Sequence, residues 1–318
     1  MALSKAPAVT HVRVDDGSAG QRIDNFLVRV CKGVPKSHIY RILRSGEVRV
    51  NSKRVAQTYR LQEGDELRIP PIRLAEKADV PPVPVGKPFD IVFEDDALLV
   101  LDKPAGLAVH GGSGVSFGVI EQLRRQRPEA KFLELVHRLD RETSGLLMVA
   151  KKRSALTVLH DMMREGRVHK RYLTLVAGRW LNLQQHIKLA LHKYLTDDGE
   201  RRVSVSRDGK PAHSIVRLVK RWQRCSLVEV ELKTGRTHQI RVHLSHSGFP
   251  LFGDDKYGDF ALNKQLEKAG LKRMFLHAAK LAFRHPLTDQ EIELASPLPA
   301  ELEAFVVSVE QNEEREYG

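Results

Sequence analysis

A proline-rich stretch divides the chain into a short N-terminal part and a longer C-terminal part. Pro70, Pro71 and the run 80–84 remove backbone donors and favour an extended path, as expected of a linker. The length of 318 residues agrees with this division, because one domain usually takes about 150 residues. The expected organisation is a lead-in over 1–19, a first domain over 20–70, a linker over 71–88, a second domain over 89–305 and an acidic tail over 306–318 that is frayed after Glu310.

The charge of the first domain favours a polyanionic partner. The chain has 52 Lys and Arg against 40 Asp and Glu, a net charge of +12. Residues 20–70 hold 11 basic and 5 acidic side chains, so half of the excess lies on about a sixth of the chain. Nucleic acid is the most common partner of such a surface.

The first domain has the pattern of two helices followed by short strands. Apolar residues recur at three- and four-residue spacing over 21–30, and the helix expected over 36–45 carries a basic stripe. Strands are expected over 48–50 and 66–69. This order resembles the S4-type RNA-binding module, and the alternative is a solvated helix face. The resemblance implies that a set of polar and basic residues contacts RNA: Lys36, Tyr40, Arg41, Arg44, Lys53 and Arg54.

Strand-like segments dominate the second domain. Tight turns between neighbouring strands indicate a mixed, mainly antiparallel sheet with flanking helices, which is an α+β domain. We expect strands over 89–93, 98–101, 145–150, 171–177, 214–219 and 226–232, and helices over 116–125, 154–164 and 237–245.

The composition excludes several classes of protein. With 42% hydrophobic and 29% charged residues, the chain is neither collagen-like nor wholly disordered. Its longest apolar runs fall short of the roughly 18 residues that a membrane span needs, and residues 1–16 lack the apolar stretch of a signal peptide. Two cysteines, Cys31 and Cys225, are too few for a disulfide framework. We therefore expect a cytoplasmic protein with no membrane partner.

Three short elements carry candidate chemistry. In the run 137–152, Asp140 lies between Arg138 and Arg141, whose opposite charges favour an ionised carboxylate. Taken alone, this pattern is equally typical of an ion-pair network. Tyr172 lies on an alternating strand, where a tyrosine is usually part of the core.

The third element, residues 234–243, turns after a strand and opens a helix. Thr237 is expected to cap this helix, which leaves Arg236 and Arg241 as donors. The histidines here, His238, His243 and His246, have no carboxylate or thiol at ligand spacing, so no metal site is expected.

In this order and spacing, the three elements resemble the RluA family of pseudouridine synthases. The resemblance extends over about residues 20–300, and its most specific motifs are HRLDRETSG and TGRTHQIRVH. Thr174 departs from the small residue usual in the family, whereas Lys170, Tyr172 and Val176 keep its pattern.

The resemblance implies isomerisation of uridine to pseudouridine in RNA without cofactor or metal. Asp140 is then the essential carboxylate, which either attacks the ribose or takes a sugar proton, and the sequence leaves both open. Arg241 is expected to pair with Asp140, Tyr172 to stack on the flipped uracil and remove its C5 proton, and Arg138 to replace the extruded base. Further substrate contacts are expected from His137, Arg141, Thr143, Arg236, His238 and Gln239.

The expected partner is RNA, with large-subunit ribosomal RNA as the substrate of a monomeric enzyme. One alternative is a non-catalytic RNA-binding or ribosome-assembly protein. It does not account for Asp140 in a cationic cleft, where a carboxylate weakens phosphate binding. The other alternative is the same reaction on transfer RNA.

Overall fold

The computed structural model describes residues 8–15, 17–31, 33–72, 86–111, 117–197 and 199–317. Most of the expected linker, 73–85, and the first residue of the helix expected over 116–125 lie outside these ranges. None of the described helices is long and apolar enough to cross a membrane.

The N-terminal module packs two helices against a three-stranded sheet. Both expected helices and both expected strands are confirmed, with small changes at their ends. The apolar faces of the helices meet in a core that includes Ile23, Leu27, Ile39 and Ile42. The elements are α1 (Ile23–Val30), α2 (Lys36–Arg44), β2 (Arg49–Val50) and β3 (Glu66–Ile69).

A further strand, β1 (Thr10–Arg13), pairs with β3 in this sheet. The sequence predicted only a lead-in over 1–19, whereas part of this segment belongs to the sheet of the module. Val14, directly after β1, is buried in the core of the module. The strand is short, lies at the sheet edge and is mostly exposed, so it has no apolar alternation to indicate it.

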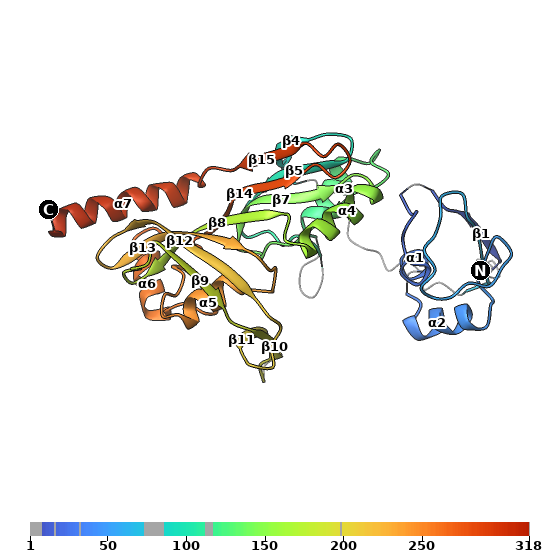
Figure 1. Ribbon diagram of the computed structural model, residues 1–318, viewed down its shortest axis with the longest axis horizontal. Coiled ribbons are helices and arrows are strands. Elements are labelled where there is room, and N and C mark those ends of the chain that lie inside the picture. The colour runs from blue at the N-terminus through green and yellow to red at the C-terminus, as the bar shows by residue number, and fades with distance from the viewer. Residues whose placement is uncertain are drawn as a thin grey trace, which may run out of the picture.

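The second domain is built on a ten-stranded sheet (Figure 1), which confirms the predicted α+β class. The strand order is β4-β5-β7-β14-β8-β13-β12-β9, with β15 beside β14 and β6 beside β7. Every pair is antiparallel except β7 with β14. The strands are β4 (Asp90–Glu94), β5 (Leu98–Lys103), β6 (Glu134–Leu135), β7 (Ser144–Ala150), β8 (His169–Ala177), β9 (Gln184–Lys188), β12 (His213–Arg221), β13 (Cys225–Leu232), β14 (Leu276–Arg284) and β15 (Glu291–Ala295).

Both faces of the sheet are covered at β7, which explains its unbroken apolar sequence. Leu147 packs in a cluster with Leu123 and Leu244, whereas the neighbouring Met148 packs on the other face with Leu159. The first cluster includes residues of α3 (Val119–Gln126) and, further along the sheet, of α5 (Gln239–His246), whereas the second includes residues of α4 (Arg153–Arg164).

The sequence predicted a frayed acidic tail, but the C-terminal segment is helical. Leu302 and Phe305 of α7 (Ala300–Tyr317) are buried against a core that also contains Phe252. Further along, Glu313 accepts a hydrogen bond of 2.8 Å from the backbone of Gln223. These contacts hold the acidic C-terminal segment against the domain, although its composition alone suggests a frayed end. The remaining helix, α6 (Phe260–Lys268), begins at an Asp259 cap.

A separate hairpin, β10 (Leu191–Leu195) with β11 (Arg201–Val205), projects from the domain (Figure 1). In β10 every residue after Leu191 is exposed, so neither a helical nor a half-buried strand pattern marks it.

Candidate active site

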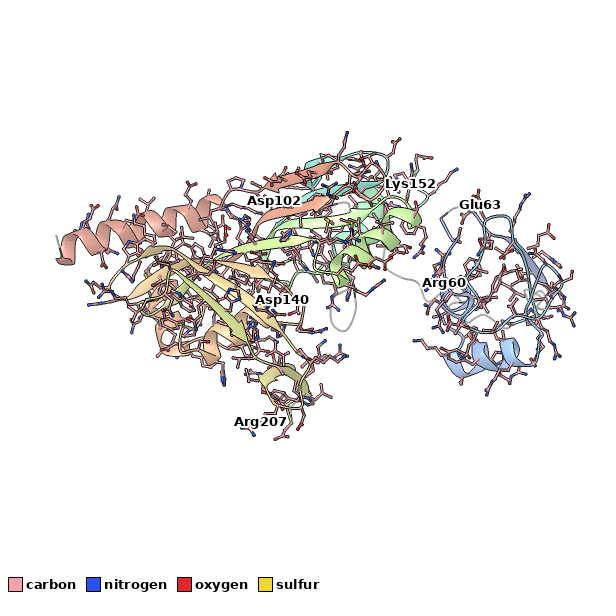
Figure 2. All side chains as sticks on the ribbon, in the orientation of Figure 1. Arg60, Glu63, Asp102, Asp140, Lys152 and Arg207 are labelled. Carbon is pink, nitrogen blue, oxygen red and sulfur yellow. The ribbon has the colours of Figure 1, made fainter. Side chains whose placement is uncertain are left out.

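The candidate carboxylate, Asp140, lies on the loop that enters β7, near the middle of the second domain (Figure 2). A buried lysine and a half-buried arginine hold the backbone of this loop. The Lys103 ammonium donates to the carbonyl oxygen of Arg141 at 3.1 Å, and Arg273 Nη2 donates to that of Glu142 at 3.2 Å. Because both ties reach the residues directly after Asp140, the carboxylate is fixed while its side chain stays 30% exposed.

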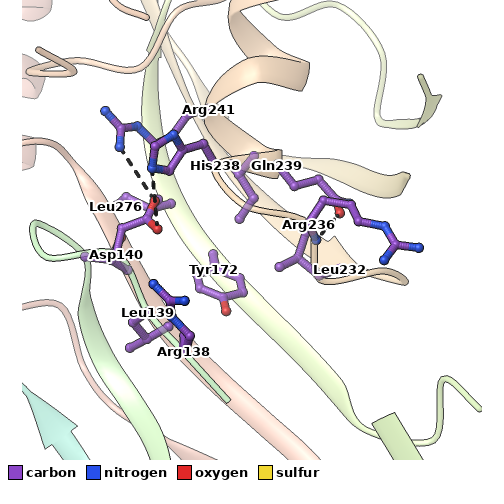
Figure 3. A pocket seen from close by; sticks show the side chains of 12 residues that line it. Arg138, Leu139, Asp140, Tyr172, Leu232, Arg236, His238, Gln239, Arg241 and Leu276 are labelled. Atoms are coloured by element: carbon purple, nitrogen blue, oxygen red, sulfur yellow. Dashed lines mark hydrogen bonds and ion pairs between the residues drawn. The ribbon is translucent and has the colours of Figure 1, made fainter. Parts of the chain in front are cut away.

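Two donors from the start of α5 face this carboxylate (Figure 3). Arg241 Nη1 lies 3.6 Å from Asp140 Oδ2, and His238 Nε2 lies 3.9 Å from Asp140 Oδ1. The expected cap of α5 by Thr237 is wrong, since the helix begins at Gln239 and His238 takes the cap position with a left-handed φ of 51°. This backbone turn directs the imidazole toward Asp140.

The main partner of Arg241 is a residue that the sequence did not indicate. Its Nε and Nη2 donate to Asp254 at 2.7 and 2.6 Å, a bidentate pair that is shorter than the contact with Asp140. Burial lowers the pKa of Arg241, but the hydrogen bonds and charge of Asp254, with the charge of Asp140, raise it above its ordinary value. The guanidinium therefore stays charged in a site where it is 5% exposed.

Tyr172 projects from β8 into the same pocket, where Leu232 and Leu276 line the wall with it. Burial, together with the charge of Asp140, raises the pKa of Tyr172 above its ordinary value. The side chain is therefore a neutral phenol near pH 7, presenting an aromatic face and one hydroxyl.

The structure brings most of the expected substrate-binding residues to this pocket. Arg138, Thr143, Arg236, His238 and Gln239 line it. The polar atoms of Gln239 are already engaged, because Oε1 accepts from Thr234 and Nε2 donates to Ser214. The Arg236 guanidinium points away from Asp140 (Figure 3) and its Nε donates to the Pro211 carbonyl oxygen.

Two of the expected residues, His137 and Arg141, do not line the pocket. His137 Nε2 accepts a hydrogen bond of 3.2 Å from the backbone of Met148. Burial lowers the pKa of His137 to about 3, so the ring is neutral and holds the strand beside it. The Arg141 side chain, 65% exposed, donates to the Gly106 carbonyl oxygen.

The pocket lies beside a much larger groove along the β10–β11 hairpin. The pocket measures about 60 Å³ and the groove about 1060 Å³, and Arg138 and His238 line both. The described lining of the groove has no carboxylate and includes the cations Arg138, Lys193, Arg201, Arg202 and Lys256. A small pocket with a carboxylate therefore adjoins a groove whose charge suits a polyanion.

The basic stripe of the N-terminal module is solvent-exposed. Lys36, Arg41, Arg44, Lys53 and Arg54 are exposed on α2 and on the turn after β2, and Tyr40 is half-buried. Arg41 pairs with Glu47 at 3.0 Å, and Arg54 donates to the Ser45 carbonyl oxygen.

The histidines of α5 do not gather around a common point. His243 is buried between the Ser214 hydroxyl and the Leu189 carbonyl oxygen, each 3.0 Å from a ring nitrogen. Among the described residues, no group of three or more His, Cys, Asp or Glu is arranged to hold a metal ion.

Comparison with known proteins agrees with this geometry. The RNA pseudouridylate synthase family model matches residues 97–246, and the S4 domain model matches residues 21–67. Ribosomal large subunit pseudouridine synthase C of Escherichia coli K12 is 52% identical over 302 residues, which cover 93% of this chain and 95% of that protein. The protein of the same name from Yersinia pestis is 50% identical over 314 residues, covering 96% and 97%. The chain belongs to the pseudouridine synthase family.

Solved structures of pseudouridine synthases share the fold of this one. Human RNA pseudouridylate synthase domain containing 4 is 25% identical with a TM-score of 0.58, over 70% of this chain and 93% of that one. Human RNA pseudouridylate synthase domain containing 1 is 27% identical with the same TM-score of 0.58, over 70% and 89%. In this pseudouridine synthase, Asp140, Tyr172 and Arg241 lie within the residues that the family model matches, whereas Asp254 lies beyond them.

Proposed function

We propose that this protein converts uridines of large-subunit ribosomal RNA to pseudouridine, with Asp140 as the reacting carboxylate. The observation that carries the proposal is the partly exposed Asp140, faced by Arg241 and His238, above Tyr172 and beside a cationic groove. The relatives that match almost the full length are named as large-subunit ribosomal enzymes, which favours that substrate over transfer RNA.

The reaction is an isomerisation. The bond from N1 of uracil to the ribose C1′ breaks, a bond from C5 to C1′ forms, C5 loses a proton and N1 gains one. Because no electrons are gained or lost overall, the proposed reaction needs no oxidant or reductant. Asp140 either attacks C1′ or removes the C2′ proton, and Arg241 is proposed to keep the carboxylate directed into the pocket.

The aromatic ring of Tyr172 is proposed to stack on the flipped uracil at the pocket wall. The raised pKa of Tyr172 favours this stacking role, because a neutral phenol is a weak base. Its hydroxyl is also proposed to relay the C5 proton: the oxygen takes that proton while the phenolic hydrogen leaves to solvent, which supplies the proton that N1 gains. Arg138, exposed where the pocket meets the groove, is proposed to fill the place of the extruded base.

The remaining residues are proposed to hold the RNA. The groove cations and the exposed stripe on α2 suit phosphate contacts, which position RNA without reading its sequence. We further propose that the protein acts as a monomer where ribosomal RNA is made, in the cytoplasm.

Tritium release tests the function directly. Large-subunit RNA transcribed with [5-³H]uridine is incubated with the full chain, and loss of tritium from C5 reports product. We expect release by the native protein and none by Asp140→Asn. Modification of transfer RNA but not of ribosomal RNA would assign the second substrate, and binding without release would favour the non-catalytic protein.

A further inference from the structure

We propose that the loop 253–258, between α5 and α6, positions both donors that face Asp140: Asp254 orients Arg241 and Tyr257 orients His238. Neither Asp254 nor Tyr257 lines the pocket, so each acts through another residue. The proposal rests on the proposed function, because the two donors matter for the reaction only if Asp140 reacts.

Asp254 determines the plane of the Arg241 guanidinium. Its two oxygens accept hydrogen bonds from Nε and Nη2 of Arg241. Oδ1 also accepts hydrogen bonds from the backbone N–H groups of Lys256 at 2.8 Å and Tyr257 at 3.0 Å. Asp254 is fully buried, so water does not compete for these bonds. Because Nε and Nη2 of the planar guanidinium are held by Asp254, Nη1 is the nitrogen that faces Asp140, 3.6 Å away.

Tyr257 determines which nitrogen of His238 carries the proton. The phenolic oxygen accepts the backbone N–H of Val203 at 3.0 Å and lies 2.7 Å from His238 Nδ1. Because a phenol has a single hydrogen, the described contacts are satisfied together when Tyr257 donates to Nδ1. Nδ1 is then an acceptor, and the proton of the neutral ring lies on Nε2, which faces Asp140 at 3.9 Å.

The charge state of His238 agrees with this arrangement. Burial lowers the pKa of His238 and outweighs the opposing effect of Asp140, so the imidazole is neutral near pH 7. A non-glycine residue at φ 51° is uncommon and costs free energy, and such backbone is typical of residues that are held for a function.

A single side chain connects the two donors. The Arg241 guanidinium carbon lies 5.1 Å from the centre of the Tyr257 ring, a cation–π contact, while His238 packs edge-on against the same ring at 5.5 Å. Displacement of Tyr257 would therefore move both donors relative to Asp140.

The loop is itself held at both ends. Asn263 on α6 donates to the Asp254 carbonyl oxygen at 2.8 Å and accepts the Gly253 N–H at 2.9 Å. Ser245 on α5 donates to the Tyr257 carbonyl oxygen at 2.6 Å. A side chain at Gly258 would meet the Asp254 carbonyl oxygen at 2.3 Å, so glycine is required for this close turn. The loop is thus a rigid support for the donors.

Two conservative variants test the proposal. Tyr257→Phe removes the hydroxyl and keeps the ring, and Asp254→Asn removes the charge and keeps the shape. We expect the single-turnover rate of tritium release to fall about 10- to 100-fold in each, because a misplaced donor costs rate, while RNA affinity changes less than about twofold. Tyr59→Phe is the matched control, since it removes a tyrosine hydrogen bond of 3.0 Å to Asp65 in the N-terminal module.

A second measurement separates positioning from a general loss of structure. In ¹⁵N-histidine spectra of the native protein, assigned with His238→Gln, we expect His238 to be protonated at Nε2 and not at Nδ1. In Tyr257→Phe we expect a mixture of the two forms. A proton on Nδ1 in the native protein would overturn the proposal, as would native rates in both variants.

These outcomes are distinct from failure of the proposed function. If the native protein releases no tritium, the function is wrong, whereas the histidine spectra still report the contact between Tyr257 and His238. If the native protein releases tritium and both variants do so at the native rate, the proposed function is retained and the positioning roles of Asp254 and Tyr257 are wrong.

Discussion

Arg241 binds Asp254 through hydrogen bonds of 2.6 and 2.7 Å, and its contact with Asp140 is 3.6 Å long. The guanidinium is therefore bound to a buried carboxylate before any substrate enters. Its charge acts on Asp140 without closing that carboxylate in a tight pair, so the Asp140 oxygens stay available to a ribose.

The first prediction concerns Asp140. Asp140→Asn keeps the shape of the side chain and removes its negative charge, so we expect normal folding and RNA binding with no detectable tritium release. The check is single-turnover release beside a filter-binding isotherm. Turnover near the native rate would exclude a reacting carboxylate at this position.

The second prediction separates the two roles of Tyr172. Tyr172→Phe keeps the aromatic face and removes the hydroxyl, so product formation is expected to fall much more than affinity. Because burial keeps this phenol neutral, raising the pH from 7 to 9 should not increase the activity of the native protein by ionising Tyr172. Equal losses of rate and affinity would mark Tyr172 as structural.

The third prediction concerns stability at the buried ion pair. Arg241→Met leaves Asp254 buried without its cation, a change worth about 3 to 5 kcal/mol of unfolding free energy. Adding Asp254→Asn removes the orphaned charge and keeps an oxygen that can accept the Lys256 and Tyr257 N–H groups, so we expect the double variant to recover much of the stability and none of the activity. Chemical denaturation and tritium release measure the two effects. A double variant as unstable as Arg241→Met would contradict the assignment of the cost to Asp254.

The fourth prediction concerns the basic stripe of the N-terminal module. Changing Lys36, Arg41 and Arg44 together to Gln should flatten the slope of log affinity against log salt concentration by about 2 to 3 units, if each contacts a phosphate. The same uridines should be modified, more slowly at limiting RNA. Arg284→Gln, on strand β14 of the other domain, is the control. An unchanged slope would remove these residues from the RNA interface.

The fifth prediction concerns acid stability and the buried Glu231. Burial raises the pKa of Glu231, but hydrogen bonds from Lys233, His169 and Arg217 outweigh it and lower the pKa to about 2. The stabilisation is therefore complete above the ordinary value of 4.5 and is lost as pH falls from 4.5 toward 2. By linkage it amounts to at most about 3 kcal/mol. Between pH 5 and pH 3 the melting temperature of the native protein should fall more steeply than that of Glu231→Gln. The exposed Glu291→Gln is the control, and parallel slopes would contradict the prediction.

The parts of the fold that could be predicted from sequence are those with a strong local pattern. The apolar spacing of 21–30 and the unbroken run of β7 mark elements whose burial is visible in the sequence itself. The hairpin β10–β11 was not predicted because most side chains of β10 are exposed. Helix α7 was not predicted because only a few residues of its acidic sequence are buried.

For the site, the motifs identified the residues that touch the pocket, and tertiary contacts supplied the rest. Asp254 lies 13 residues after Arg241, and two aspartates before a tyrosine look like an ordinary turn. Its role follows from the fold of α5 against the loop, which no local spacing reports. His137 is the opposite case, a motif residue without a place in the pocket. It belongs to the most specific motif, yet its ring accepts a hydrogen bond from the backbone of Met148.

The parallel pairing of β7 with β14 has a consequence for synthesis of the protein on the ribosome. Residues 97–246 contain Asp140, Tyr172 and Arg241, yet β14 lies between β7 and β8 in the sheet and ends at Arg284. The Ser144 hydroxyl, directly after the Asp140 loop, meets His277 across 133 residues of chain. A nascent chain that has exposed all three residues thus still lacks the strand that joins the two halves of the sheet. Activity should therefore appear late, once the last tenth of the chain is being made, so that incomplete chains do not modify RNA beside the ribosome.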